Sequence, residues 1–334
     1  MTLKIQHGQI FTFMSIKNKF KAILHPFEAI KGSVNTGVDN IKTLMQTDYF
    51  KKLSHDLTNQ TLRSKESGIT SEKICPEDVV VSLTSYGRRI YDVYLAIESI
   101  MQGSLKPNRI ILWLSEDEFK RNTLPITLQN QIKRGLEIYY CKDIRSFKKL
   151  IYTLKECPDA TIVTIDDDVI YNFDFLENLV KSHSENPSYL YANRVHRIKK
   201  NRDGSLKNYL NWEYCVSANS SDVNDLFFTG IGGVLYPPYS LHKEVFNEDV
   251  FAKICPTADD VWFNAMVRLK GTQICKSFTH SPNGEDFTVN EALQYDGLWA
   301  INNNPNDCQN DKQIKAVFEK YGINNFDVKQ VKRE

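Results

Sequence analysis

Three consecutive aspartates, Asp166, Asp167 and Asp168, are the residues of this 334-residue chain whose type and spacing best suit chemistry. They follow the apolar run 160–165, which is rich in β-branched residues and predicts a buried strand. Three carboxylates at one strand end repel one another, and a hard divalent cation such as Mg²⁺ or Mn²⁺ offsets that charge. Two interpretations stay open here: a metal site, or an acidic turn in which an aspartate caps a helix over 173–182.

A second acidic group, Asp259 and Asp260, stands before an apolar helix predicted over 261–269. Carboxylates in this position can stabilise the positive end of a helix dipole. Alternatively, one of them can take a proton from an acceptor hydroxyl as a general base. His196 and His280 are candidate extra metal ligands, and we prefer His280 because it lies in a polar loop. The alternative for either histidine is a structural role.

Polar and basic residues follow two of the predicted strands. The segment 84–89, TSYGRR, has hydroxyls and an aromatic ring that suit a base and a ribose, and arginines that suit phosphate. Arg145 and Lys148 begin a helix, where the helix dipole disfavours cations, and this indicates an anionic ligand. Solvated surface charges are the alternative in both places. The glycine-rich segment 228–238 permits close approach to a ligand but lacks the spacing of a phosphate-binding loop.

The elements that must position these residues alternate between strands and helices. The pattern predicts strands over 79–83, 109–114, 136–140 and 161–165, and helices over 90–101, 128–135, 146–156 and 312–321. We therefore expect an α/β fold with a mostly parallel sheet flanked by helices on both faces. Ligands of such sheets bind at the carboxyl ends of the strands, where the aspartates and segment 84–89 stand.

The composition is that of a soluble globular protein, with 41% hydrophobic and 25% charged residues. A net charge of +1 gives no electrostatic footprint for nucleic acid, so we expect no nucleic-acid partner. The seven cysteines form no CxxC pair and predict free thiols in a reducing cytosol. Because no apolar run reaches the length of a spanning helix, we expect a cytoplasmic protein.

Residues 1–75 differ from the rest of the chain in charge. They hold 11 Lys+Arg against 6 Asp+Glu, whereas the remainder holds 31 against 35. Within them, residues 10–24 are apolar at irregular helical spacing with interleaved lysines. This pattern predicts either an amphipathic segment peripheral on the inner face of the plasma membrane, or a helix that packs on its own domain or on a partner chain.

Taken in order, these motifs resemble those of bacterial GT-A-fold glycosyltransferases of capsule and lipopolysaccharide biosynthesis, which carry an Asp-x-Asp motif. The resemblance covers roughly residues 78–310 and depends on the ordered set TSYxxR, DxRSxKK, DDD, GGVLYPP and ADDxW. It implies a GT-A-like (Rossmann-like) α/β domain with a nucleotide-sugar-binding half over 76–185 and an acceptor-binding half over 186–334. An extra N-terminal helical, basic segment over 1–75 precedes that domain.

The resemblance also implies roles for individual residues. Asp166 and Asp168, with His280 as an extra ligand, would hold Mn²⁺ or Mg²⁺ against the diphosphate of a nucleotide-sugar donor. Asp260, or alternatively Asp259, would be the base of an inverting hexosyl transfer to a glycan or lipid-linked glycan acceptor. Asp166 is also a candidate for the ribose. The donor pocket would be lined by Thr84, Tyr86, Arg88, Arg145, Lys148, Asp166 and Asp167.

Two other classes of protein stay open. A nucleotidyltransferase that makes the sugar-nucleotide would need a glycine-rich, basic loop after the first strand, and Gly87 is the only glycine there. A non-catalytic sugar-binding protein on the same fold would be expected to have lost some of the acidic residues, and this chain keeps them.

Overall fold

The computed structural model describes residues 44–120, 123–217, 225–281, 284–290 and 301–323. The chain divides into two compact units, Met1–Leu53 and Ser54–Glu334. The described residues of the first unit, 44–53, are helical. The segment 10–24, for which we predict an amphipathic character, lies outside the described residues. Within the part that is described, no helix has both the length and the hydropathy needed to cross a bilayer.

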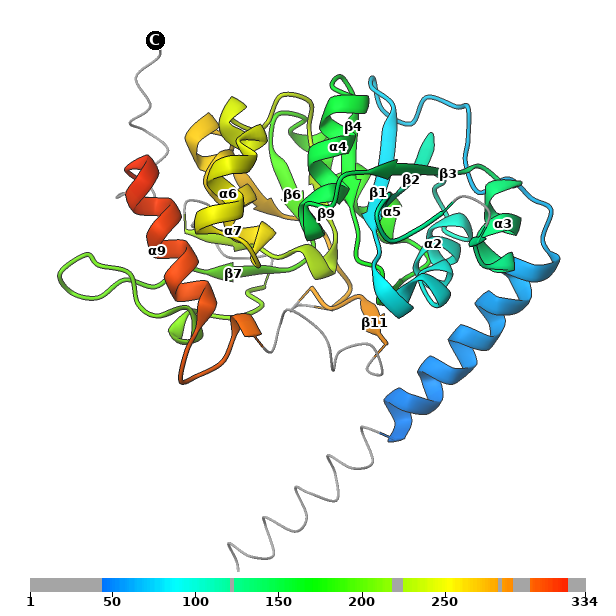
Figure 1. Ribbon diagram of the computed structural model, residues 1–334, viewed down its shortest axis with the longest axis horizontal. Coiled ribbons are helices and arrows are strands. Elements are labelled where there is room, and N and C mark those ends of the chain that lie inside the picture. The colour runs from blue at the N-terminus through cyan, green and yellow to red at the C-terminus, as the bar shows by residue number, and fades with distance from the viewer. Residues whose placement is uncertain (1–43, 121–122, 218–224, 282–283, 291–300, 324–334) are drawn as a thin grey trace, which may run out of the picture. The chain divides into compact units, whose positions relative to one another are not determined.

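A seven-stranded sheet in the order β10-β6-β9-β4-β1-β2-β3 forms the centre of the second unit (Figure 1). Four neighbouring pairs are parallel, whereas β9 is antiparallel to both of its neighbours. The predicted mostly parallel α/β sheet is therefore confirmed. The strands are β1 Val79–Thr84, β2 Arg109–Ser115, β3 Leu136–Cys141, β4 Thr161–Thr164, β6 Leu190–Ala192, β9 Val234–Tyr236 and β10 Ile274–Lys276.

Two short antiparallel ladders and a set of helices complete the described fold. One ladder pairs β5 (Val169–Tyr171) with β11 (Phe287–Val289), and the other pairs β7 (Val195–Arg197) with β8 (Leu226–Phe228). The α-helices are α2 Tyr94–Met101, α3 Ile126–Ile132, α4 Lys148–Glu156, α5 Phe175–Glu185, α6 Glu248–Ile254, α7 Asp259–Lys270 and α9 Gln309–Tyr321. Short 3-10 turns precede several of them, including Gly87–Tyr91 and Arg145–Phe147.

Strand β1 shows why this sequence forms a central strand. Its residues are almost entirely buried, as expected for a parallel strand covered on both faces. Val79, Val81 and Leu83 pack with residues of α2 and α5, whereas Val80 faces the opposite side of the sheet. On that opposite side, Ser82 donates to the Lys149 carbonyl of α4 at 2.5 Å. The sheet thus has helices on both faces, and the side chains of β1 contact helices on each face.

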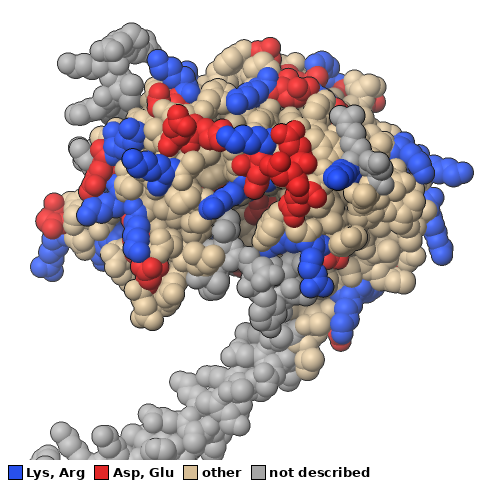
Figure 2. Space-filling model, viewed as in Figure 1, with Lys and Arg blue, Asp and Glu red and all other residues tan. Residues whose placement is uncertain are grey.

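Residues 54–63 are helical and pack against the sheet domain through buried polar contacts. Thr61 donates to Glu98 of α2 at 3.1 Å, and Glu98 forms a 2.8 Å ion pair with Arg134. Both members of that pair are almost fully buried. By contrast, Lys142 and Glu248 form an ion pair that is exposed to water, where such pairs are screened and contribute little. Charges of both signs are interspersed over the face shown in Figure 2.

The direction of the strands brings three distant segments to one edge of the sheet. Strands β1 and β4 are parallel with Ser82 opposite Thr164, so residues 84–86 and the aspartate triplet leave the sheet together. Strand β9 runs the opposite way, with Val234 opposite Thr164. The glycine-rich turn before β9 therefore arrives where the aspartates leave.

The predicted helix cap at the triplet is wrong. Strand β5 begins at Val169, directly after Asp168, because its pairing with β11 keeps the backbone extended. Helix α5 begins only at Phe175, with Asp174 at the capping position. None of the three aspartates is thus the N-cap of that helix, and their charge must be compensated in another way.

Candidate active site

A cavity of about 550 Å³ lies at this edge of the sheet. That volume is typical of a site for a small molecule. The ends of β1 and β4 line it, together with the starts of α4 and α7 and the turn before β9. Nine of the predicted site residues line it: Thr84, Tyr86, Arg145, Lys148, Asp166, Asp167, Asp168, Asp259 and Asp260.

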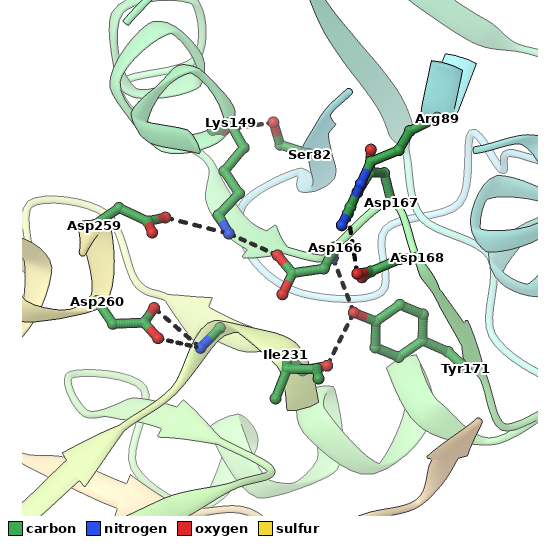
Figure 3. A network of polar contacts seen from close by, with 11 residues as sticks. Ser82, Arg89, Lys149, Asp166, Asp167, Asp168, Tyr171, Ile231, Asp259 and Asp260 are labelled. Atoms are coloured by element: carbon green, nitrogen blue, oxygen red, sulfur yellow. Dashed lines mark hydrogen bonds and ion pairs between the residues drawn. The ribbon is translucent and has the colours of Figure 1, made fainter. Parts of the chain in front are cut away.

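Two cations compensate the aspartate triplet (Figure 3). The Lys149 ammonium lies 2.7 Å from Asp166 Oδ1. The Arg89 guanidinium lies 2.8 Å from Asp167 and 3.0 Å from Asp168. Asp167 is 7% exposed, and Asp166 and Asp168 remain partly open to the cavity. The triplet therefore has one buried structural member and two members that a ligand can reach.

The triplet carries more negative charge than its partners balance. Burial raises the pKa of Asp168 to about 6, and repulsion from Asp166 and Asp167 adds to that rise. Burial likewise raises the pKa of Asp167, although Arg89 acts against it. A site that holds its carboxylates at a raised pKa favours an added positive charge.

Lys149 joins the triplet to the second acidic group. Besides Asp166, its ammonium lies 3.3 Å from Asp259 Oδ2 at the start of α7. Burial opposes the charge of Lys149, but Asp166, Asp259 and Asp260 outweigh that effect and raise its pKa well above the ordinary value. The Lys149 side chain is thus held charged between two acidic groups that lie far apart in the sequence.

Gly230 brings Asp260 into the same site. Its backbone N–H donates to both carboxylate oxygens of Asp260, at 3.0 and 3.1 Å. A Cβ at this position would lie 3.1 Å from Asp260 Oδ1 and 3.3 Å from Lys149 Nζ, so only glycine leaves the present spacing undisturbed. The Tyr171 hydroxyl ties this turn to the triplet, because it accepts from the Asp166 N–H and donates to the Ile231 carbonyl.

Asp260 has a raised pKa. Burial raises its pKa to about 7, the neighbouring Asp259 carboxylate adds to the rise, and Lys149 opposes it. A carboxylate with a pKa near neutrality can both accept and release a proton under ordinary conditions.

The start of α4 forms the basic end of the cavity. Lys148 is paired with Asp143. Arg145 has a positive φ of 59°, which is uncommon for a residue other than glycine, and its guanidinium donates to the Pro256 carbonyl at 3.0 Å. The Ser146 hydroxyl lines the cavity, is buried and has no hydrogen-bond partner among the described residues. A hydroxyl and backbone N–H groups at a helix start suit an anion.

A further part of the cavity lining is aromatic. Tyr209, Tyr214 and Phe227 line it there, with Arg194 and the side chains of Asn302, Asn303 and Asn310. We call this set of residues the aromatic end. Burial raises the pKa of the Tyr209 hydroxyl, and the charge of Asp260 adds to that rise, so Asp260 lies near the aromatic end.

Three predicted residues lie apart from this arrangement. Arg88 is exposed, and neither it nor His280 is among the described residues that line the cavity. His280 is exposed and pairs with Asp174. His196 is fully buried, and its Nδ1 accepts from the Cys215 N–H at 3.0 Å. Within the described ranges, no group of three or more His, Cys, Asp or Glu side chains is placed to hold a metal ion.

The residues that sequence reasoning missed are neighbours of predicted ones. Arg89 and Lys149, not Arg88 and Lys148, contact the aspartates. Both predicted positions belong to a pair of adjacent basic residues, and the sequence does not show which member points inward.

No protein-family model matches this chain, and no curated protein matches it significantly. Among solved structures, it is similar to a mannosyltransferase from Pyrobaculum calidifontis in complex with GDP-Man and Mn²⁺, at 12% identity and a TM-score of 0.41, over 67% of this chain and 65% of that one. It is also similar to HddC from Yersinia pseudotuberculosis, at 13% identity and a TM-score of 0.31, over 51% and 79% of the two chains. A third is CMP:2-keto-3-deoxy-manno-octonic acid synthetase complexed with CTP, at 9% identity and a TM-score of 0.33, over 61% and 92%. TM-scores this low leave the function to be argued from the cavity.

Proposed function

We propose that this protein is a metal-dependent glycosyltransferase that moves a sugar from a nucleoside-diphosphate sugar to a hydroxyl of a glycan acceptor, with inversion. The observation that carries the proposal is the joining of two acidic groups in one cavity by Lys149 and Gly230. The triplet at 166–168 suits the binding of a cation and a diphosphate. The pair at 259–260 suits the acceptance of a proton. Transfer of a glycosyl group to a hydroxyl needs both.

The residues present fit a divalent cation. Asp166 and Asp168 offer carboxylate oxygens, which Mg²⁺ and Mn²⁺ prefer, and such ions commonly use one or two carboxylates together with substrate phosphates. The raised pKa of Asp168 indicates charge that a cation would relieve. When bound, the ion would stabilise the charge of the departing nucleoside diphosphate.

The basic end supports the binding of the donor's phosphates. Arg145 offers a guanidinium that forms no ion pair with the described residues, and Ser146 offers a hydroxyl without a partner there. Thr84 and Tyr86 line the same cavity and suit the nucleoside. These groups would hold the donor so that its anomeric carbon lies toward Asp260.

Asp260 is the residue that we assign as the base. Its carboxylate is fixed by the Gly230 N–H, and it lines the same cavity as the aromatic end. As the acceptor oxygen attacks the anomeric carbon, its proton passes to Asp260, and the bond to the diphosphate breaks. Lys149 keeps the two acidic groups close together and offsets their charge.

A donor screen tests the proposal. The protein is incubated with a panel of nucleotide sugars, with Mn²⁺ or with EDTA, and free nucleoside diphosphate is measured by chromatography. We expect release that depends on the metal. A parallel series with nucleoside triphosphates and sugar 1-phosphates measures pyrophosphate. Pyrophosphate release without nucleoside diphosphate release would instead identify a nucleotidyltransferase, and no release in either series would contradict both activities.

We further propose that the acceptor belongs to a surface polysaccharide such as capsule or lipopolysaccharide. The support for this class is the ordered set of motifs in residues 78–310. Extracts of surface glycans from bacteria, supplied as acceptors with the donor found in the screen, test it by the incorporation of labelled sugar.

A further inference from the structure

Arg194 at the aromatic end is held in place by its backbone. A Cβ at Gly232 would lie 2.8 Å from Arg194 Cβ, and a Cβ at Gly284 would lie 3.1 Å from Arg194 Cα. The Arg194 carbonyl accepts from the Thr229 N–H at 3.1 Å. Two glycines and a hydrogen bond therefore fix where this side chain enters the cavity.

The charge of Arg194 has no carboxylate partner in the described part of the chain. Arg89, Lys148 and Lys149 each form an ion pair at the cavity, whereas no ion pair among the described residues includes Arg194. Its guanidinium contacts the Cys215 thiol. Its Nε is buried and has no hydrogen-bond partner among those residues. A guanidinium fork in such a position suits a carboxylate or a phosphate.

Tyr214 supplies an open aromatic ring beside this charge. It is 38% exposed, whereas Tyr209 behind it is 6% exposed. The two rings lie 5.6 Å apart, edge to face, and the Cys215 N–H bond to His196 fixes the segment that carries Tyr214. An accessible aromatic ring beside a charged group can bind the apolar face of a sugar.

We infer that the aromatic end is a subsite for an acceptor saccharide that carries an anionic group, either a carboxylate or a phosphate. Arg194 binds the anion, and the sugar ring stacks on Tyr214. The inference rests on the proposed function, because only a glycosyltransferase has an acceptor at this end of the cavity. It adds the chemical class of that acceptor and the residue that selects it.

Binding to matched sugars tests the inference. The probes are methyl glycosides in the gluco, galacto and manno series, each as the neutral hexoside, the uronate and the 6-phosphate, titrated by calorimetry into the full chain. We expect at least one series in which an anionic member binds at least about tenfold more tightly than the neutral one, as for a charged hydrogen-bonded pair. The uronate and phosphate arms distinguish the two anions.

The variant Arg194→Gln is expected to bind the anionic and neutral members equally, and Arg194→Lys to keep part of the preference. Tyr214→Ala should weaken both members by the same factor, while Tyr214→Phe keeps the wild-type affinities. Melting curves confirm that each variant is folded. Equal affinity for anionic and neutral sugars in the wild type, no binding of any probe, or a preference that survives Arg194→Gln would each overturn the inference.

The proposed function can fail separately from this subsite. The dissociation constant for the nucleotide sugar is measured on the same proteins, and Arg194→Gln is expected to change it less than twofold. A large loss of donor affinity in Arg194→Gln would indicate that Arg194 binds the donor, and would overturn the proposed acceptor subsite. If no donor is turned over by the wild type, the glycosyltransferase assignment fails, and the sugar titrations still report whether Arg194 selects an anion.

Discussion

The two acidic groups of the cavity are compensated in different ways. The triplet at 166–168 follows a strand, and the side chains of Arg89 and Lys149 offset part of its charge. The pair at 259–260 begins a helix, and there Asp260 receives a backbone N–H from Gly230. Lys149 is the one described cation that forms ion pairs with both groups.

This difference separates two chemical tasks. Arg89 and Lys149 offset only part of the charge of the triplet, so an added cation would relieve the remainder. A neutral N–H donor fixes the direction of a carboxylate without adding a full charge. Burial and the neighbouring Asp259 carboxylate raise the pKa of Asp260 to about 7, and a carboxylate with this pKa can exchange a proton. The predictions below alter one group at a time.

The largest effect is expected at the triplet. Asp168→Ala should lower metal-dependent release of nucleoside diphosphate by on the order of 10⁴-fold, because it removes a proposed ligand of the ion that stabilises the leaving group. The fold should persist, since Arg89 keeps Asp167 as its partner. Steady-state release with Mn²⁺ measures the effect. Asp203→Ala, in an exposed turn, is the matched control, and activity in Asp168→Ala near that of the control would rule out Asp168 as a ligand.

The next effect is expected at the helix start. Asp260→Asn should slow transfer by about 10³-fold, because the amide cannot accept the acceptor's proton. Donor affinity should change little, since the substitution keeps the size of the side chain. Asp259→Asn is the paired comparison, and we expect it to slow transfer less because the contact of Asp259 is with Lys149. A larger loss of transfer in Asp259→Asn would instead identify Asp259 as the base.

A smaller effect is expected at the glycine between the two groups. Gly230→Ala places a Cβ 3.1 Å from Asp260 Oδ1 and 3.3 Å from Lys149 Nζ, so the groups must shift. We expect transfer to fall by roughly 10- to 100-fold, as for a small misplacement of reacting groups. Gly271→Ala is the control: that glycine ends α7 with a φ of 81° and open space around it. It should cost about 1 kcal/mol of stability and leave transfer unaffected.

The smallest effect concerns stability and pH. The pKa of Asp260 is higher in the folded protein than in the unfolded chain, so its contribution to stability is present below about pH 4 and is lost as the pH rises through about 7. In EDTA, the wild type should therefore lose more unfolding free energy between pH 5 and pH 8 than Asp260→Asn does, by about 2 kcal/mol. Urea unfolding at the two pH values measures this. Identical losses in the two proteins would contradict the raised pKa.

The sequence predicted the sheet well because its strands are long apolar runs with helices between them. The parallel order of β1, β2 and β4 and their polar carboxyl ends follow from that pattern, and so did the convergence of Thr84 with the aspartates. Strand β5 was missed because its three residues are extended only through pairing with β11, more than a hundred residues later. Local sequence carries no trace of such a partner.

The sequence predicted many of the residues that line the cavity, but not the contacts between them. The choice between Arg88 and Arg89 depends on a 3-10 turn over Gly87–Tyr91, which buries the second arginine and exposes the first. The bond between Gly230 and Asp260 depends on the antiparallel entry of β9, which no spacing in the sequence reveals. Arg194 gave no signal at all, because its position is fixed by close backbone contacts with two distant glycines.

The strand order also determines how the domain unfolds and where the chain can be divided. Strand β4 precedes the predicted boundary at 185 and β9 follows it, yet the two are neighbours in one sheet. Separating the halves would leave a long open edge on each, with unpaired backbone groups and uncovered apolar surface. We therefore expect residues 54–334 to melt in a single cooperative transition, and a chain cut between 185 and 186 to recover structure only when both fragments are present together. In engineering terms, the two halves of this chain cannot be exchanged as modules, and its binding specificity will have to be changed side chain by side chain.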